Sequence, residues 1–456
     1  MKTRITRRGF LATTGLAAGI TLLPSVTRNV LGANEKLNIA GIGAGGKGYV
    51  DTSLCASENL VALCDVDQKN GEVGFKRFPD AVRFADYRVM LEKMDKVIDA
   101  VTVSTPDHSH ASAAIRAMNM GKHVYCQKPL THSIAEARLM TRVARQRKVV
   151  TQMGNQGHNH SDTRRLVELI KAGVIGQVKE IHVWTDRAGP VWPQGDAAMN
   201  AFKAGAGAKV PAHVDWDLWL GPAKDRPYNS AYLPFRWRGF WDFGTGAVGD
   251  MGCHNMDLAF WSLDLRDPVS AESEFAENYA EVGPAWAIIT INFPKRGDLP
   301  ACSLKWYEAG KKPDPALANQ KTLPRNGTIM IGSKDTLYVP HYWGKGTFTS
   351  GAKTEDFSQV PVTLPRMAGS DNEGNIDANH HLEWIAAIKA NKPEMAMSNF
   401  DYAGPMTEAV LLGNTAVRAG KKIEWDAKTL SITNDKEANR FVRDEYRKGW
   451  EIEGMA

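Results

Sequence analysis

Two short segments of this chain of 456 residues carry side chains that could move a proton to or from a hydroxyl group. The first is the segment Cys126-Gln127-Lys128-Pro129, which follows a short apolar run. A lysine at the end of such a run could hold a substrate hydroxyl and, with a lowered pKa, help to take its proton. Considered alone, a lysine such as Lys128 is more often a surface residue in a turn between a strand and a helix than a catalytic one.

The second segment places Asp250 and His254 four residues apart. On a helix this spacing puts both side chains on one face. His254 could then remove a hydroxyl proton while hydride leaves the same carbon, with Asp250 orienting the ring. The alternatives are a capping aspartate beside a core histidine, and a metal site that would also draw on His158 and His160. Two ligands without a clear third are a weak metal signal, and we predict no metal.

A glycine-rich turn near the N-terminus indicates which kind of ligand would lie beside these groups. The apolar run Leu37–Ile42 leads into Gly43-Ala44-Gly45-Gly46-Lys47-Gly48, and a second apolar run, Leu60–Cys64, ends at Asp65. A strand, a G-x-G-x-x-G turn, a helix, a strand and then an acid form the pattern of a dinucleotide-binding unit. Gly43 permits the tight turn, Gly45 lets the backbone approach a pyrophosphate, and Gly48 lets the helix pack closely. The new helix offers its N-terminus to the phosphates, and Asp65 is placed for a ribose hydroxyl, which favours NAD over NADP.

The elements that must hold these groups fall into two patterns. Up to about residue 152, apolar strand candidates alternate with helical segments such as 111–120 and 134–147, which predicts a parallel sheet covered on both faces. Beyond it, the strand candidates 180–186, 287–293, 301–307 and 328–339 are separated by long loops, which suits an antiparallel or mixed sheet. Helices are expected at 163–172, 380–390 and 402–419. We therefore predict a Rossmann domain at 34–152 and a second α/β domain at 153–456.

Aromatic residues mark a candidate substrate region. Seven of the thirteen tryptophans fall between Trp184 and Trp261, in a stretch rich in Gly and Pro. Core filling is the usual explanation for any one of them. Several tryptophans among Asp186, Arg187, Arg236 and Arg238 also suit stacking on sugar rings with hydrogen bonds to hydroxyls. The candidate substrate contacts are His158, Arg187, Trp192 and Arg236.

The first 33 residues resemble a twin-arginine export signal. Lys2, Arg4, Arg7 and Arg8 precede an apolar run too short to span a bilayer, and no acid occurs before Glu35. With Arg28, these cations account for the whole formal charge of +5, so the remaining chain is near neutral. We therefore expect export to the periplasm, no membrane anchor and no nucleic-acid partner. The five cysteines show no paired metal spacing and are expected to be buried free thiols.

Taken together, four motifs resemble the Gfo/Idh/MocA oxidoreductases, the family of glucose–fructose oxidoreductase and inositol dehydrogenase. The motifs are the glycine turn, Thr105-Pro106-Asp107-His108-Ser109-His110, the Lys-Pro turn and the segment from Asp250 to His254. The resemblance covers essentially the whole chain after the signal, and it implies a second domain with a large, open, mainly antiparallel sheet that often forms the oligomer contact. It also implies that Lys128, Asp250 and His254 act on a sugar or polyol hydroxyl. The cofactor contacts would be Gly43, Gly45, Gly46, Gly48, Asp65, Thr105, Pro106, His110 and Lys128. The family motif has Glu where this chain has Gln127, which removes a negative charge beside the lysine.

The leading hypothesis is an oxidoreductase that transfers hydride between a secondary hydroxyl of a sugar, glycoside or polyol and NAD, with NADP left open. Because a free cofactor is not replenished outside the cytoplasm, we predict a tightly bound one. The same residues would serve an NAD-dependent glycosidase that oxidises, eliminates, hydrates and reduces again. A sugar-binding protein on a Rossmann scaffold is a third reading, since fold alone does not fix function. We also expect a homo-oligomer formed through the C-terminal sheet.

Overall fold

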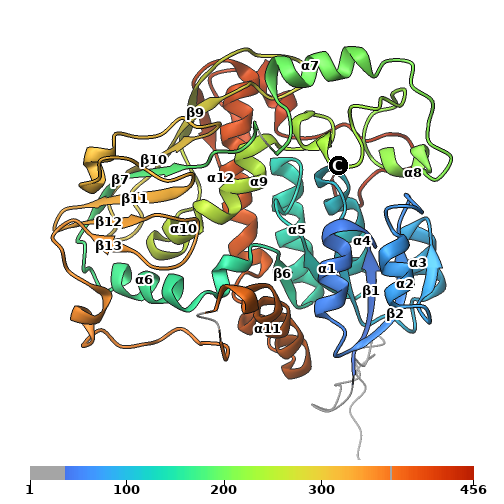
Figure 1. Cartoon of the computed structure of the whole chain (residues 1–456), viewed down its shortest axis with the longest axis horizontal. Helices are drawn as coiled ribbons and strands as arrows, with labels where there is room; N and C mark the ends of the chain where they lie inside the picture. The colour runs from blue at the N-terminus through green and yellow to red at the C-terminus, as the bar shows by residue number, and fades with distance from the viewer. Residues whose placement is uncertain (1–35, 190, 370–371, 456) are drawn as a thin grey trace, which may run out of the picture.

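Two sheets and the helices packed around them make up the described part of the chain (Figure 1). The computed structural model describes residues 36–189, 191–369 and 372–455, so the predicted export signal at 1–33 lies outside the described residues. Within the described part, no helix is long and apolar enough to cross a membrane.

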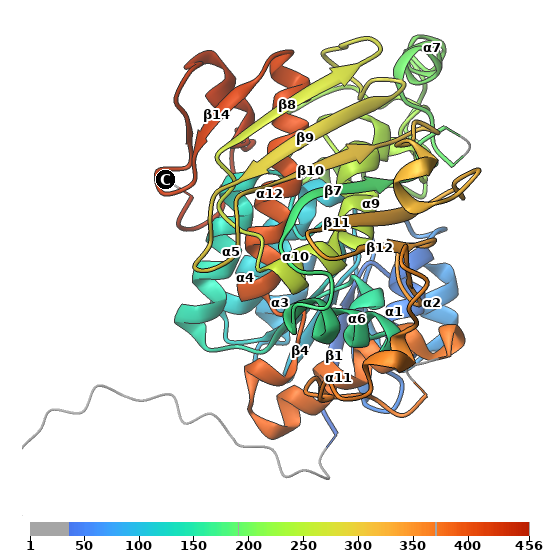
Figure 2. The ribbon, with the colours of Figure 1, turned by 90° about the vertical axis from the view of Figure 1, so that its left-hand side faces the viewer.

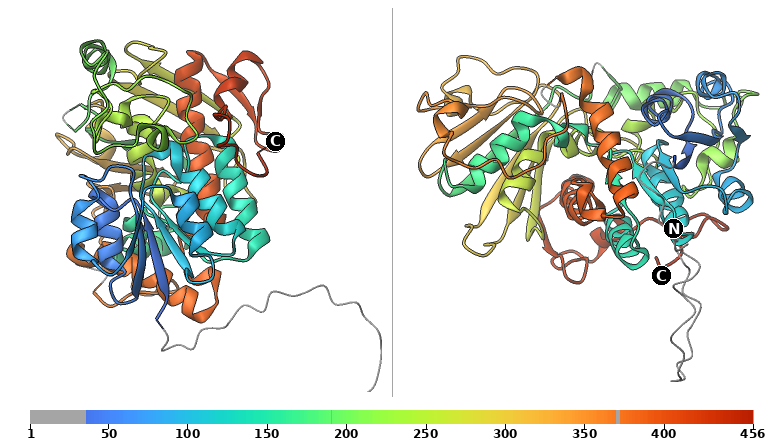
Figure 3. Two further views of the ribbon diagram at one scale, coloured as in Figure 1. Left: turned by 90° about the vertical axis from the view of Figure 1, so that its right-hand side faces the viewer. Right: turned by 90° about the horizontal axis from the view of Figure 1, so that it is seen from below.

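The first sheet has six parallel strands in the order β3-β2-β1-β4-β5-β6, as predicted for a Rossmann domain. Its strands are β1 (Asn38–Ile42), β2 (Asn59–Cys64), β3 (Val82–Phe84), β4 (Ala100–Val103), β5 (His123–Cys126) and β6 (Thr151–Met153). Its connecting helices are α1 (Gly46–Leu54), α2 (Glu72–Arg77), α3 (Tyr87–Lys93), α4 (His110–Asn119) and α5 (Ile134–Arg147). All four residues of β4 are buried, as expected for a strand covered on both faces. Figure 3 shows helices on either side of these strands.

The last part of the chain supplies a helix that covers this first sheet. Trp384 and Ile388 of α11 (Ile376–Ala390) pack on Leu37, Ile39 and Tyr125, on the strands' surface that α4 and α5 leave free. The Tyr125 hydroxyl lies 2.9 Å from Nδ1 of His380, and its ring stacks on His381 with centroids 4.1 Å apart. The two halves of the sequence therefore share one core.

The second sheet has nine strands in the order β13-β12-β11-β7-β10-β9-β8-β14-β15. All neighbours are antiparallel except β7 and β10, which confirms the predicted mainly antiparallel sheet. The strands are β7 (Val178–Trp184), β8 (Ser270–Phe275), β9 (Ala287–Phe293), β10 (Cys302–Tyr307), β11 (Gly327–Gly332), β12 (Thr336–Val339), β13 (Thr347–Phe348), β14 (Ile423–Asp426) and β15 (Ser431–Ile432). The segment 328–339, expected as one strand, is a hairpin of β11 and β12. Figure 2 shows β8 to β12 in front, with α12 behind them.

Helix α12 (Phe400–Ala419) lies between the two domains and packs on both α5 and the strands β8 and β9. Asn399 caps its N-terminus by accepting from the amides of Asp401 and Tyr402, and Gly420, at φ 67°, ends it as predicted. The remaining helices are α6 (Ser161–Lys171), α7 (Gly195–Ala204), α8 (Trp216–Leu220), α9 (Gly246–Asn255) and α10 (Asp257–Leu263). Helices α7 and α8 lie in the stretch that the sequence indicated only as loop. All five cysteines are buried and free, as predicted.

Candidate active site

One cavity of about 610 Å³ contains both the glycine turn and the proposed catalytic residues. Gly43, Gly45 and Gly46 line one part of it, and Lys128, Asp250 and His254 line another. Its volume is in the usual range for a small-molecule site. The two domains thus place the groups predicted from separate motifs against a common space.

Lys128 and Asp250 form an ion pair across the domain boundary. Lys128 follows β5 and donates from Nζ to Oδ1 of Asp250 at 2.7 Å and to its carbonyl oxygen at 2.9 Å. Arg238 Nε lies 3.3 Å from the same Oδ1. Burial alone would raise the pKa of Asp250, but the Lys128 and Arg238 charges outweigh it and lower the pKa to about 2. Asp250 is therefore a fixed carboxylate between two cations.

His254 stands one helical turn after Asp250 on α9. Its Nδ1 is enclosed without a hydrogen-bond partner among the described residues, which leaves Nε2 as the ring nitrogen able to meet a ligand. Burial, and next the charge of Lys128, lower the pKa of His254 to about 3, so the ring is neutral near neutral pH. We expected Asp250 to orient this ring. The structure instead commits the Asp250 carboxylate to Lys128 and Arg238.

The glycine turn is packed too tightly for side chains at Gly43, Gly45 and Gly48. A Cβ on Gly43 would lie 2.6 Å from the carbonyl oxygen of Ser104, and one on Gly48 would lie 2.2 Å from that of Gly43. At Gly45 the close neighbour is the carbonyl oxygen of Asn70, at 2.2 Å. Gly46, at φ 52°, has no atom within 4 Å of the same position and begins α1 at the cavity. The start of α1 therefore lies open to the cavity, which fits a pyrophosphate at the N-terminus of this helix.

Asp65 directly follows β2, with its carboxylate turned onto the glycine turn. Its Oδ2 accepts from the amides of Ala44 at 2.9 Å and Gly45 at 3.1 Å, and its Oδ1 accepts from the amide of Asp67 at 2.9 Å. Burial raises the pKa of Asp65, against the effect of these three amides. The carboxylate lines the cavity. Its predicted contact with a ribose hydroxyl stays a prediction, and the observed bonds show that it also fixes the turn.

The predicted contacts from the segment after β4 divide into lining and supporting residues. Thr105 and Pro106 line the cavity. His110 is buried below them, with its ring nitrogens 2.8 Å from the carbonyl oxygens of Thr105 and Pro129. His110 thus joins this segment to the turn that carries Lys128.

Gln127 is buried beside a carboxylate of the neighbouring helix. Its Nε2 donates to Oδ2 of Asp51 at 2.9 Å, and the Ser104 hydroxyl donates to the same atom at 2.6 Å. Lys47 and His381 lie 3.2 Å and 3.3 Å from the other carboxylate oxygen. Burial would raise the pKa of Asp51, yet these partners lower it to about 2. A negative charge therefore lies within one hydrogen bond of position 127, on α1.

The four candidate substrate contacts do not all meet the cavity. Arg187 and Trp192 line it. Arg236 is exposed and does not line it, whereas Arg238, two residues later, does. His158 is fully buried away from the cavity lining: its Nδ1 lies 3.0 Å from the Asp257 carboxylate, and its ring stacks on Trp261. His158 is thus a core histidine in this structure, because the segment before α6 turns it toward Asp257.

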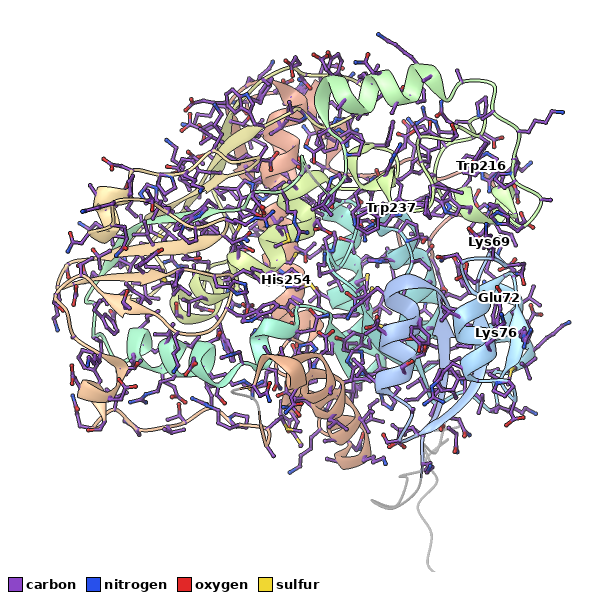
Figure 4. The ribbon with its side chains drawn as sticks, viewed as in Figure 1. Lys69, Glu72, Lys76, Trp216, Trp237 and His254 are labelled. Atoms are coloured by element: carbon purple, nitrogen blue, oxygen red, sulfur yellow. The ribbon has the colours of Figure 1, made fainter. Side chains whose placement is uncertain are left out.

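Sequence reasoning missed several aromatic residues of the substrate end. Phe235 and Trp237 line the cavity, and the Arg238 guanidinium lies 3.8 Å and 4.2 Å from their ring centroids. Tyr342 and Trp343 complete this wall from the loop after β12. The run His341-Tyr342-Trp343 is an aromatic signal in the sequence, but its distance from the other motifs hid its place. Figure 4 shows Trp237 and His254 toward the middle of the molecule.

No group of three or more histidine, cysteine, aspartate or glutamate side chains with the arrangement of a metal site occurs in the described ranges.

Fold and cavity together define a two-domain protein with a dinucleotide site between a Rossmann domain and a second α/β domain. The sequence profile described as "Oxidoreductase family, NAD-binding Rossmann fold" matches residues 36–155, and that of the family's C-terminal alpha/beta domain matches residues 160–298. The chain belongs to the Gfo/Idh/MocA family of oxidoreductases.

Curated relatives are similar over part of their length. Inositol 2-dehydrogenase of Salmonella typhimurium is 26% identical over 151 residues, which is 32% of this chain and 44% of that protein. 2,7-Anhydro-N-acetylneuraminate hydratase of Escherichia coli is 26% identical over 38% of this chain and 46% of that protein. The chain thus spans less than half the length of these relatives.

Solved structures share the whole fold. The WlbA dehydrogenase from Bordetella pertussis, in complex with NADH and UDP-GlcNAcA, superposes with a TM-score of 0.59 at 15% identity, over 86% of this chain and 99% of that one. The inositol dehydrogenase homolog from Azotobacter vinelandii, in complex with NADH and myo-inositol, gives a TM-score of 0.56 at 16% identity, over 87% of this chain and 100% of that one.

Proposed function

We propose that this protein oxidises or reduces a secondary alcohol of a sugar, glycoside or polyol with NAD. The observation that carries the proposal is the single cavity shared by the glycine turn, Lys128, Asp250 and His254. The family's NAD-binding Rossmann profile and its sugar- and polyol-converting relatives support it.

The residues present fit the nucleotide. The first turn of α1 would face the pyrophosphate, and Asp65 would lie at the adenosine ribose. Bound in this way, NAD supplies the hydride acceptor or donor. The chain itself supplies binding, orientation and the path of the proton.

The substrate hydroxyl is held between Lys128 and His254. The Lys128 ammonium, fixed by Asp250, donates to the hydroxyl oxygen and stabilises negative charge that develops there. As the C–H bond breaks, Nε2 of His254 takes the hydroxyl proton and the carbon becomes a carbonyl; reduction runs in reverse. The aromatic side chains of Trp192, Trp237 and Trp343 give a sugar ring apolar faces to stack on.

Export and self-association are further proposals. Arg7 and Arg8, with the apolar run after them, support export. The test is to compare the export of a tagged fusion protein with that of a variant in which both arginines are replaced by lysine. The surface of the second sheet that faces away from α12 supports association of copies through it (Figure 2). Light scattering of the purified protein would measure the oligomeric state.

The test is a panel of sugars and polyols added to the protein loaded with NAD. A change in nicotinamide absorbance with no release of an aglycone supports the oxidoreductase. Release of an aglycone from a chromogenic glycoside, without net change in the cofactor, would support the redox-neutral glycosidase instead. Binding of a sugar with neither signal would favour a binding protein.

A further inference from the structure

A segment of the second domain reaches over to the residues that follow β2. Residues 211–222, which we call the strap, pair with the residues after β2: Asp67 and Val214 form an antiparallel bridge. The amide of Asp215 donates to the carbonyl of Val66, and the amide of Gln68 donates to that of His213, both at 2.9 Å. In addition, Nδ1 of His213 lies 2.8 Å from the carboxylate of Asp67. Figure 4 shows Trp216 of the strap and Lys69 on the same side of the molecule, that of the Rossmann domain.

The far end of the strap is held by the motif after β4. The buried ring of His108 lies with Nε2 3.0 Å from the carbonyl oxygen of Trp219. Burial lowers the pKa of His108 to about 4, so a neutral ring donates this bond. The strap is therefore attached to the Rossmann domain at two places, the residues after β2 and His108.

The C-terminal tail, residues 444–455, fixes the strap from outside. Arg447 donates to the carboxylate of Asp217 at 2.5 Å, to its carbonyl at 2.7 Å and to the carbonyl of Gly221 at 3.1 Å. Its own amide donates to the carbonyl of Pro222 at 3.1 Å. One arginine thus makes most of the bonds between tail and strap.

Trp450 joins the tail to the Rossmann domain. Its buried indole lies under the Arg88 guanidinium, 3.6 Å from the ring centroid, and 6.2 Å from the ring of Tyr87 on α3. A Cβ on Gly221 of the strap would lie 3.6 Å from the same indole, so Trp450 lies next to the strap at this glycine. Strap, tail and α3 meet at this side chain.

These segments form the cavity wall at the end where the adenosine half of a dinucleotide lies, beyond β2. Leu218, Trp219, Gly221 and Trp450 line the cavity together with Asp65, Val66, Ala85 and Tyr87. We propose that the strap and Trp450 complete an adenosine subsite and hold NAD through successive turnovers. A nucleotide bound between these walls leaves only when the strap parts from the tail, and Arg447 opposes that step. The inference rests on the proposed function.

The test is the exchange of bound NAD for deuterium-labelled NAD, followed by desalting and mass spectrometry. The wild-type protein should retain about one NAD per chain through gel filtration. Bound NAD should exchange at least about tenfold faster in Arg447→Ala and in Trp450→Ala than in the wild type. Each substitution removes contacts whose loss is expected to raise the dissociation rate by that factor or more. Lys448→Ala is the matched control: it removes an exposed cation beside Arg447 and should exchange as the wild type does.

Milder variants guard against loss of folding. Arg447→Lys keeps a charge for Asp217 but loses the fork that reaches the two carbonyls, and Trp450→Phe keeps an aromatic ring, so both should exchange at intermediate rates. Circular dichroism would confirm that each variant is folded. If the folded variants exchange as slowly as the wild type, or the wild type as fast as the variants, the subsite proposal is wrong while NAD binding stands. If the wild type binds no NAD at all, the proposed function fails as well.

Discussion

Lys128 of the first domain and Asp250 of the second meet at 2.7 Å, with the lysine ammonium also 2.9 Å from the Asp250 carbonyl. The pair joins the turn after β5 to the helix that carries His254. The position of the lysine ammonium is therefore fixed by a residue far away in the sequence.

Because Lys128 and Asp250 act as one unit, their replacements should not add. Lys128→Met and Asp250→Asn should each lower kcat/KM for the best substrate of the panel by about 10²- to 10⁴-fold, and the double variant should be no worse than the poorer single one. The NAD content of each variant, measured after gel filtration, serves as the control. Fully additive losses would show that the two side chains work separately.

The pH dependence of turnover should show no titration of His254 near its ordinary pKa. Burial and the Lys128 charge place that pKa at about 3, so the free enzyme keeps a neutral base through the neutral range. We expect kcat/KM of the wild type to lack an acid limb centred near pH 6.5. His254→Gln should lose about 10²- to 10⁴-fold in kcat at every pH. An acid limb near 6.5 that disappears in His254→Gln would contradict this assignment.

The same histidine should make the fold less stable in acid. The native ring stays neutral down to about pH 3, whereas the unfolded chain takes up the proton near pH 6.5, so the unfolded state binds more protons between these values. The free energy of unfolding should therefore decrease as the pH is lowered from about 6.5 to about 3. His254 contributes up to about 1.4 kcal/mol of this decrease per pH unit. Urea unfolding between about pH 6 and pH 4 should show a shallower decline for His254→Gln. Equal slopes would mean that the histidine is protonated in the native protein.

Gln127→Glu should destabilise the protein, although Glu is the residue of the family motif. The new carboxylate would lie beside Asp51, and it cannot give the hydrogen bond that Gln127 now donates at 2.9 Å. Two buried like charges should cost about 3 kcal/mol in urea unfolding. Adding Asp51→Asn should recover most of this loss. In the double variant the residue at position 127 carries the single negative charge, and the residue at position 51 donates the hydrogen bond. A single variant as stable as the wild type would show that Asp51 does not set the charge at this site.

Local patterns predicted the parts of the molecule that neighbouring residues determine. Helix α5 has the expected bounds of 134–147, because Ser133 and Glu136 form a capping box at its start. Gly43, Gly45 and Gly48 were recognised because a tight turn excludes side chains whatever lies around it. Lys128, Asp250 and His254 were found through the combination of motifs, and the structure brings them to one cavity.

Contacts between distant segments escaped prediction. Asp250 was assigned to His254 from helical spacing, but the sequence does not show that Lys128 and Arg238 approach the same carboxylate. Arg236 and Arg238 are the same residue type two positions apart, so the sequence does not distinguish them. Only the conformation of their turn exposes Arg236 and directs Arg238 to the cavity. The strap and Trp450 have no local signature at all, since their partners lie in another domain.

The packing of α11 on the first sheet has a consequence for how the chain is made. When the sixth strand has left the ribosome, the surface that later receives Trp384 and Ile388 is still bare, and Tyr125 has no histidine to pair with. That surface stays open while strands β7 to β13 of the second sheet are being synthesised. A fragment cut after Met153 should accordingly aggregate or need a chaperone, whereas the complete chain covers this surface itself once α11 has been made.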